Sequence, residues 1–374
     1  MIKVPAHVKD LKPYIPGKPI EELAREKGLA QIVKLASNEN PLGPSPKAIA
    51  AVAAALPRFA RYGDPIAFDL NKAVAAKLGL APENVMFGAG SDSLIMYVVA
   101  TFSEEGDHVL TSAGSFIGIY VNANKLGRTV EALPLRDYRY DLDAILRSIG
   151  PRTRIIYLAN PNNPTGAIIT KAEMSAFLDR VPSDVLVLLD EAYSSYAREN
   201  ADYPDGVDYV ADNVIVVRSF SKDYGLAGFR VGMALGPAEL IAQLRKVKLP
   251  FEPSYPAQVA ALAALEDEEH IALTLETNRR SLERMRRLFE KLEIRYIPSC
   301  ANFMLMVFEN DEFAARFAAE CLERGLILRH VASFGLPHCV RINSGTEVET
   351  EFALEAIEAA FEHVKAELSA GCGV

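Results

Sequence analysis

The sequence predicts a two-domain α/β protein, and two observations support this fold class. The chain has 374 residues, 50% of them hydrophobic, which is enough for a large buried core and for two domains. Short runs rich in β-branched residues recur between residues 85 and 235, mostly separated by segments long enough for a helix. Several runs are apolar at every position, as in strands covered by helices on both faces of a doubly wound sheet. The expected strands lie in "NVMF", "DHVLTS", "RIIYLAN", "DVLVLLDEAY", "NVIVVRS" and "RVGMAL".

Three parts are expected along the chain. Residues 1–35 combine Pro-rich turns with one short helix and no strand core, as in an arm that packs on another part of the protein. Residues 36–265 contain the expected strands and form the large domain. Residues 266–374 begin and end with a long amphipathic helix, and a capping box of Thr346 and Glu349 starts the second one. The strand-like runs "YIPSCANFMLMVF" and "CVRINSG" between these helices predict a smaller α+β domain.

The first of these helices is rich in arginine, with five arginines in residues 279–287. Glu276, Glu283 and Glu290 are interleaved with them. A solvated face of paired charges is therefore a better interpretation than an anion site.

Composition excludes several classes of function. The formal charge of -9 argues against a nucleic-acid binder, which needs clustered Lys and Arg, and no apolar run approaches the roughly 20 residues that span a bilayer. The six histidines show no metal-site spacing. The four cysteines are far apart and no secretory leader opens the chain, which predicts reduced thiols and a cytoplasmic protein. Small molecules are the expected partners.

Lys222 is the first candidate for chemistry. It follows the buried run "NVIVVRS", so its amine is expected at the carboxyl edge of the sheet, where open α/β folds bind ligands. Ser219, Ser221 and Arg230 offer donors around it, and nearby glycines let the backbone come close. A solvated surface lysine is the alternative, but these neighbours indicate an anion site beside an amine.

A second anion site is predicted in "FGAGSDSLI". Gly90, Ser91 and Asp92 follow a strand there and open a helix, whose first backbone N–H groups are unpaired. Two alternatives stay open: a simple tight turn, and a dinucleotide-binding fingerprint whose third glycine position holds Ser93.

Three further polar residues follow strands. Asp190 ends the apolar run "VLVLL", and it either caps the next helix or is a buried anion that needs a cationic partner. Tyr193 adds a phenol near the same edge, and Asn163 in "NPNNPTG" adds an amide, although that motif could be only a turn.

These groups together predict pyridoxal phosphate as the cofactor. Its aldehyde takes a lysine, its protonated ring nitrogen takes a carboxylate, and its phosphate takes helix N–H groups and arginine.

The chain resembles the histidinol-phosphate aminotransferase family of the fold-type I aminotransferases, nearly from end to end. The stretches that carry the resemblance are "PYIPGKPIEEL", "KLASNENPLGPSP", "RYGDP", "GAGSD", "NPNNPTG", "LLDEAYSSY", "SFSKDYGLAGFRVG", "SCANF" and "GLILRHVASFGLPHCVRINSGT". The resemblance implies a large domain with a mixed, mostly parallel seven-stranded sheet covered by helices, and a smaller α+β domain. It also implies a transaminase of histidine biosynthesis that converts L-histidinol phosphate and 2-oxoglutarate to imidazole acetol phosphate and L-glutamate.

The resemblance assigns roles in cofactor binding. Lys222 would form the Schiff base with the cofactor and move a proton between substrate and cofactor. Asp190 would keep the ring nitrogen protonated, and Asn163 and Tyr193 would hold the ring oxygen. Phosphate binding would fall to Gly90, Ser91, Asp92, Ser219, Ser221 and Arg230, and ring stacking to Phe116.

The resemblance also implies a homodimer with shared active sites. Tyr62 in "RYGDP" would reach the cofactor phosphate of the neighbouring subunit, and Tyr14 of the arm would lie near the partner's substrate pocket.

Substrate binding is implied for Arg341, Arg329 and Asn38. Arg341 would bind a carboxylate bidentately, since a planar guanidinium matches that group, and Arg329 would lie near the substrate phosphate. The chain departs from the family at Glu252, where asparagine is more common, at Gly63 and in "INSG". If Glu252 faced the pocket, its charge would oppose a substrate phosphate.

Other activities stay open at this point. An aromatic amino-acid transaminase would share every cofactor residue, and a decarboxylase on the same scaffold would differ only in which substrate bond is aligned for cleavage. A nicotinamide-dependent oxidoreductase would rest on "GAGSDS" and leave Lys222 unexplained. A non-catalytic regulator is disfavoured because no helix-turn-helix extension precedes the arm.

Overall fold

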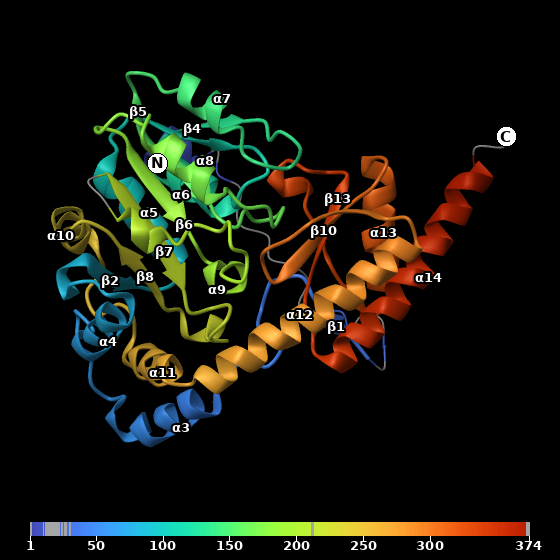
Figure 1. Cartoon of the computed structure of the whole chain (residues 1–374), viewed down its shortest axis with the longest axis horizontal. Helices are drawn as coiled ribbons and strands as arrows, with labels where there is room; N and C mark the ends of the chain where they lie inside the picture. The colour runs from blue at the N-terminus through green and yellow to red at the C-terminus, as the bar shows by residue number, and fades with distance from the viewer. Residues whose placement is uncertain are drawn as a thin grey trace.

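The computed structural model describes residues 2–9, 11, 23, 25, 28–29, 31–210 and 213–371. Tyr14 lies outside the described residues, so its place near a substrate pocket stays a prediction. A larger lobe built on a sheet and a smaller lobe lie side by side, and the long helix α12, Glu268–Lys291, runs from the first to the second (Figure 1).

Seven strands form the sheet of the larger lobe, in the order β2-β8-β7-β6-β5-β3-β4. Only β8 runs antiparallel to its neighbours, so the sheet is mixed and mostly parallel, which confirms the predicted fold class. All six predicted runs contain a strand. The bounds are β2 Val85–Gly88, β3 His108–Ser112, β4 Thr129–Leu133, β5 Thr153–Ala159, β6 Leu186–Asp190, β7 Val214–Ser219 and β8 Gly232–Leu235.

Helices cover both faces of this sheet, which explains why its central strands are apolar throughout. Val187 and Leu189 of β6 belong to one buried cluster, while Leu186 and Leu188 belong to another on the opposite face. The first face is covered by α3 Pro46–Ala55, α4 Phe68–Leu78, α7 Leu142–Arg147, α8 Lys171–Leu178 and α11 Tyr255–Leu265. The second is covered by α5 Ser91–Phe102, α6 Ile117–Lys125 and α10 Ala238–Val247.

The smaller lobe contains an antiparallel sheet in the order β12-β13-β10-β9. Its core packs Met285 of α12, Phe317 of α13 and Ile357 of α14 against Val340 of β13. The predicted capping box is confirmed, because Glu349 Oε2 accepts from Thr346 N at 2.8 Å and Glu349 N donates to Thr346 Oγ1 at 3.2 Å. The elements are β9 Arg295–Ile297, β10 Phe303–Val307, α13 Asp311–Glu323, β12 Arg329–His330, β13 Cys339–Asn343 and α14 Glu347–Gly371.

Four strands lie outside the predicted runs, and one of them is the short strand β12 of the smaller lobe. The edge strand β4 is partly exposed, so it lacks the apolar run that marks its neighbours. The strand β1, Val33–Lys34, pairs in parallel with β11, Leu326–Ile327, and Val33 enters the core of the smaller lobe. Residues 1–35 therefore do contribute a strand, contrary to expectation, because two residues are too few to show a periodicity.

The remaining elements are short helices. They are α1 Ala6–Lys9, α9 Ser194–Ala197, η1 Leu56–Arg58, η2 Pro82–Asn84, η3 Gly206–Tyr209, η4 Ala227–Phe229 and η5 Ala332–Phe334. Within the described residues, no helix combines the length and the apolar character that crossing a membrane requires. The same residues contain no group of His, Cys, Asp and Glu side chains suited to a metal ion.

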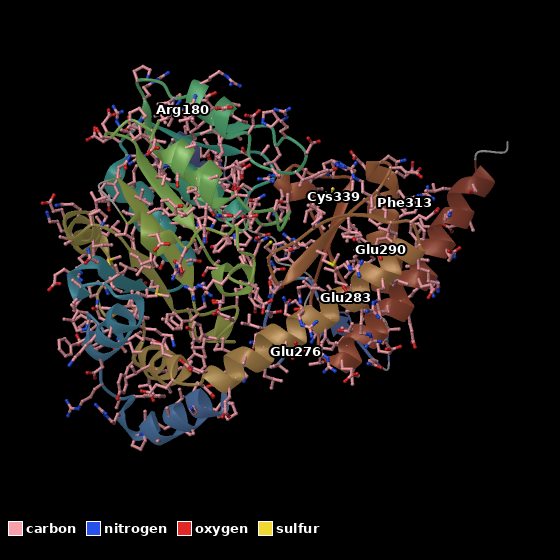
Figure 2. All side chains as sticks on the ribbon, viewed as in Figure 1. Arg180, Glu276, Glu283, Glu290, Phe313 and Cys339 are labelled. Atoms are coloured by element: carbon pink, nitrogen blue, oxygen red, sulfur yellow. The ribbon has the colours of Figure 1, made fainter. Side chains whose placement is uncertain are left out.

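The charged face of α12 agrees with the sequence pattern. Glu276, Glu283 and Glu290 are spaced along this helix (Figure 2). Arg279 Nη2 lies 2.8 Å from Glu276 Oε1, and Arg286 pairs with Glu283 at 2.8 Å and with Glu290 at 2.5 Å. Four of the five arginines are thus paired within their own helix, and the fifth, Arg284, pairs with Glu351 of α14.

Candidate active site

A cavity of about 270 Å³ is lined by residues of both lobes, at the carboxyl edge of the larger sheet. The strands β5, β6 and β7 run in parallel and end at this edge, so the residues that follow them meet there. The predicted residues that line it are Asn38, Ser91, Asp92, Phe116, Asn163, Asp190, Tyr193, Ser219, Ser221, Lys222, Arg230, Arg329 and Arg341. The structure therefore assembles in one place residues that are up to 303 positions apart between Asn38 and Arg341.

The amine of Lys222 has weak partners in this cavity. Lys222 Nζ donates to Ser37 O at 3.4 Å and lies 5.8 Å from the ring centroid of Tyr193. Burial lowers the pKa of the Lys222 amine to about 8, and the positive charge of Arg341 contributes to this shift. The neutral form of the amine, which can act as nucleophile or base, is therefore more populated near neutral pH than it is in an exposed lysine.

Asp190 is a buried anion rather than a helix cap. Asp190 is only 4% exposed, and no side chain caps the helix α9 that follows. Asp190 Oδ2 accepts from Tyr157 Oη at 2.7 Å and Oδ1 accepts from Ala192 N at 3.1 Å. Within the described residues no Lys or Arg forms an ion pair with it, and burial raises its pKa to about 6. A carboxylate in this state favours a cationic ligand.

Four polar side chains form a connected network across the two lobes. Asn38 Nδ2 donates to Tyr193 Oη at 2.8 Å, and Asn163 Nδ2 approaches the same oxygen at 3.4 Å. Arg341 Nη1 donates to Asn163 Oδ1 at 2.5 Å. Asn38 Oδ1 is buried and has no hydrogen-bond partner in the described part of the chain, so it can accept a bond from a ligand.

The anion end of the cavity is formed by the start of α5 and by Arg230. The residue before this helix, Gly90, has φ 87° and provides no side-chain cap, so the first N–H groups lack a capping side chain. A Cβ at Gly90 would lie 2.5 Å from Arg230 Nη2, so only glycine lets the guanidinium approach the helix start. Helix N–H groups and a guanidinium together suit a phosphate.

These features fit pyridoxal phosphate. The cavity offers an amine with a lowered pKa at Lys222, a buried carboxylate without a cation in the described structure at Asp190, and an anion site at the start of α5. Pyridoxal phosphate needs all three of these features, for its aldehyde, its ring nitrogen and its phosphate.

Two predicted contacts lie elsewhere. Tyr62 is 82% exposed, stacks on Phe251 at 4.3 Å between ring centroids, and does not line this cavity within one chain. Glu252 does not line the cavity either, because its Oε2 accepts from Tyr97 Oη at 2.7 Å and Ala89 N at 3.3 Å. The expected conflict between Glu252 and a substrate phosphate therefore has no support in the structure.

The sequence analysis did not identify Tyr157 and Phe334, among other residues of the site. Tyr157 binds Asp190 from inside the apolar strand β5, and a lone phenol in such a strand is a signal, because a buried hydroxyl needs a partner. Phe334 of η5 lines the cavity beside Arg329 and Arg341, and its short segment gives no sequence signal.

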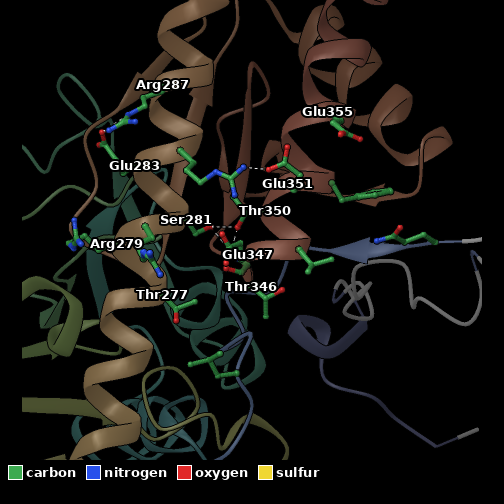
Figure 3. A pocket seen from close by; sticks show the side chains of 17 residues that line it. Thr277, Arg279, Ser281, Glu283, Arg287, Thr346, Glu347, Thr350, Glu351 and Glu355 are labelled. Carbon is green, nitrogen blue, oxygen red and sulfur yellow. Dashed lines mark hydrogen bonds and ion pairs between the residues drawn. The ribbon is translucent and has the colours of Figure 1, made fainter.

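A second cavity, of about 860 Å³, lies between α12 and α14 (Figure 3). The arginines that line it all pair with carboxylates: Arg284 pairs with Glu351, Arg287 with Glu283, and Arg279 and Arg280 with Glu276. None of the predicted site residues lines it, so the smaller cavity is the candidate active site.

Comparison with known proteins defines the class. The family model of the class I and II aminotransferases matches residues 30–357, and the chain belongs to this family. A solved histidinol-phosphate aminotransferase from Sinorhizobium meliloti, in complex with pyridoxal-5'-phosphate, superposes with a TM-score of 0.90 at 29% identity over 97% of this chain and 99% of that one. The chain is thus a pyridoxal-phosphate-dependent aminotransferase that acts on small molecules.

The sequence relatives define the branch of this family. Histidinol-phosphate aminotransferase from Anaeromyxobacter sp. is 43% identical over 360 residues, which cover 95% of this chain and 98% of that protein. The enzyme of the same name from Moorella thermoacetica is 40% identical over 353 residues, which cover 94% and 91%. The chain is a member of the histidinol-phosphate aminotransferase family.

Proposed function

We propose that this enzyme transfers the amino group of L-histidinol phosphate to 2-oxoglutarate, giving imidazole acetol phosphate and L-glutamate in histidine biosynthesis. The observation that carries the proposal is the presence of two arginines, Arg329 and Arg341, in one cavity with Lys222. One half-reaction needs a site for a phosphate ester and the other needs sites for carboxylates, and guanidinium groups suit both. The relatives at 40% and 43% identity carry the name of this activity.

The residues of the larger lobe would hold the cofactor. When bound, pyridoxal phosphate supplies an aldehyde for the amino group and a ring that withdraws electrons from the neighbouring carbon. The backbone N–H groups after Gly90 would bind its phosphate together with Arg230, and Phe116 would offer an aromatic face to its ring. These N–H groups belong to Ser91 and Asp92, and Ser219 and Ser221 would be further phosphate ligands.

Lys222 and Asp190 would do the proton chemistry. Lys222 Nζ would bind the cofactor, take the proton from the reacting carbon of the substrate and deliver it to the cofactor, a task that its pKa of about 8 suits. Asp190 keeps the proton on the ring nitrogen of the cofactor, and Tyr157 Oη holds this carboxylate in place. Tyr193 and Asn163, already linked to each other, would hold the ring oxygen.

Arg341, Arg329 and Asn38 would bind the substrate. Arg341 takes the α-carboxylate of glutamate, and Arg329 takes the phosphate of histidinol phosphate. Asn38 Oδ1, buried without a partner in the described structure, accepts a hydrogen bond from the substrate.

A homodimer with shared active sites is part of the proposal. Most of the large apolar side chains that are exposed in the described structure come from residues 49–68 and 247–251. These two segments touch, because Tyr62 stacks on Phe251 and Lys248 Nζ donates to Pro65 O at 2.8 Å. A contiguous apolar surface of this kind is typical of a subunit interface. The members are Ile49, Leu56, Tyr62, Ile66, Phe68, Val247, Leu249 and Phe251.

Mixing two inactive variants tests the shared sites. Lys222→Ala and Tyr62→Ala damage different subunits of one site, so exchange of subunits between them is expected to restore about a quarter of wild-type activity, since half the dimers are hybrids with one intact site each. Activity that stays at the sum of the two parents after confirmed subunit exchange would contradict the shared site.

The pH dependence of cofactor binding tests Asp190. Its pKa of about 6 in the cofactor-free protein means that the carboxylate is protonated below that pH, so cofactor affinity is expected to fall as pH drops through about 6. The Tyr157 hydrogen bond lowers this pKa, so Tyr157→Phe is expected to move the acidic limb to higher pH. Titration of cofactor absorbance at several pH values checks both the fall in affinity and its shift. If the pH at which affinity falls were the same in Tyr157→Phe as in wild type, Tyr157 would not have this role.

Donor preference separates this function from an aromatic amino-acid transaminase. Purified holoenzyme is mixed with histidinol phosphate or with phenylalanine, and the loss of the yellow cofactor absorbance is followed. Histidinol phosphate is expected to react with a second-order rate constant at least about 100-fold larger, because phenylalanine leaves the phosphate site empty. Faster reaction of phenylalanine would favour the aromatic transaminase, and release of carbon dioxide from an amino acid would favour a decarboxylase.

A cytoplasmic location completes the proposal. Cys300, Cys321 and Cys339 are all free thiols, as is usual in a reducing compartment.

A further inference from the structure

The two arginines of the cavity are direct neighbours in the smaller sheet. Arg329 of β12 and Arg341 of β13 are opposite each other in an antiparallel pair. Like charges at directly opposed positions destabilise a sheet and can converge on one anion, unless something keeps them apart.

The ring of Phe334 is close to both of these charges. Its ring centroid is 5.9 Å from Arg329 Cζ and 6.0 Å from Arg341 Cζ, so each guanidinium is within reach of a cation–π contact. Phe334 is 9% exposed and lines the same cavity. One aromatic ring therefore contacts both cations at the wall of the active site.

The two arginines differ in what else holds them. Arg341 is buried, donates to Asn163 Oδ1 and to Ala36 O, and lies 5.2 Å from the ring of Phe303. Arg329 has no side-chain hydrogen bond or ion pair in the described structure, and its cation–π contact is with the ring of Phe334. Loss of the Phe334 ring would thus release Arg329 and leave Arg341 in place.

We infer that Phe334 is a positioning residue that sets Arg329 as a phosphate site separate from the carboxylate site at Arg341. The inference rests on the proposed function, because it assigns the anions of the two half-reactions to different arginines. Phe334 then determines selectivity for the phosphate ester and has little influence on the dicarboxylate.

The backbone of Phe334 is fixed independently of its ring. Phe334 O accepts from Gly114 N at 2.8 Å, and Phe334 N donates to Val331 O at 2.9 Å. A change of the side chain therefore tests the ring and not the path of the chain.

The test compares Phe334→Leu and Phe334→Tyr in the full-length holoenzyme. Phe334→Leu is expected to lower kcat/KM for histidinol phosphate about tenfold, and that for glutamate less than about twofold, because Arg341 keeps its hydrogen bonds to Asn163 and Ala36 when the ring is lost. Phe334→Tyr keeps the ring and is expected to stay within about twofold of wild type for both substrates. Equal losses for both substrates, or no loss for histidinol phosphate, would overturn the inference.

Two controls separate this role from a structural one. Phe308→Leu removes a similarly buried ring that contacts Phe313 and Phe317 in the same lobe, and it is expected to lower the melting temperature without changing the ratio of the two rate constants. In an Arg329→Gln background, Phe334→Leu is expected to have no further effect on histidinol phosphate; an undiminished tenfold loss there would contradict action through Arg329.

The outcome also distinguishes the inference from the proposed function. Wild-type enzyme that fails to react with histidinol phosphate overturns both, whereas wild-type enzyme that reacts, with a Phe334→Leu variant that keeps its selectivity, overturns the inference alone.

Discussion

Replacing Lys222 by alanine is expected to abolish amino-group transfer, with a loss of at least about 10⁴-fold in the single-turnover rate. The amine both attaches the cofactor and moves the substrate proton, and the described cavity has no second lysine among its lining residues. Stopped-flow measurement of cofactor absorbance after mixing with histidinol phosphate checks this. Lys246→Ala, which removes an exposed amine bonded to Gln243, is the matched control and is expected to behave as wild type.

The thermal stability of Lys222→Ala shows whether its loss of activity comes from the missing amine or from unfolding. Burial lowers the pKa of the Lys222 amine from 10.5 to about 8, so below about pH 8 the cofactor-free folded protein holds a charge that the unfolded chain would solvate better. Cofactor-free Lys222→Ala is therefore expected to melt at or above the temperature of cofactor-free wild type at pH 7, with the difference shrinking between about pH 8 and 10.5. A variant that is inactive because it is unfolded, or one with a normal single-turnover rate, would contradict the role of Lys222.

Replacing Asp190 by asparagine is expected to slow proton removal from the substrate by about 10²- to 10⁴-fold while the cofactor still binds. The amide keeps the shape of the side chain but carries no charge to hold a proton on the ring nitrogen. Single-turnover rates with substrate deuterated at the reacting carbon check whether proton removal is the step that slows.

A neighbouring carboxylate provides the control for Asp190. Asp223 is also 4% exposed, binds Ser195, and does not line the cavity. Asp223→Asn is expected to change stability more than rate. An unchanged rate in Asp190→Asn, or equal losses in both variants, would remove Asp190 from the mechanism.

The strands of the larger sheet were predictable because packing on both faces leaves a local mark. β5, β6 and β7 are buried along almost their whole length, and their sequences are apolar at consecutive positions. β4 and β1 escape prediction for the opposite reason, since an edge strand is partly exposed and a two-residue strand shows no period.

The cofactor residues of the larger lobe were predictable from their position after strands. Asp190 is the last residue of the apolar strand β6, and Lys222 follows shortly after the apolar strand β7. Because these strands are parallel, both residues lie at the same edge of the sheet. The contacts between the two lobes were not predictable. Arg341 and Asn163 are 178 residues apart, and nothing in either local sequence requires them to meet. The position of Phe334 close to two arginines is likewise a product of tertiary structure.

Reduction of the holoenzyme with sodium borohydride, followed by peptide mapping, tests most directly the claim that Lys222 binds the cofactor. The mass of the reduced cofactor is expected on the peptide that contains Lys222. An adduct on another lysine, such as Lys248, whose pKa is also lowered by burial, or an active enzyme without any adduct, would contradict it.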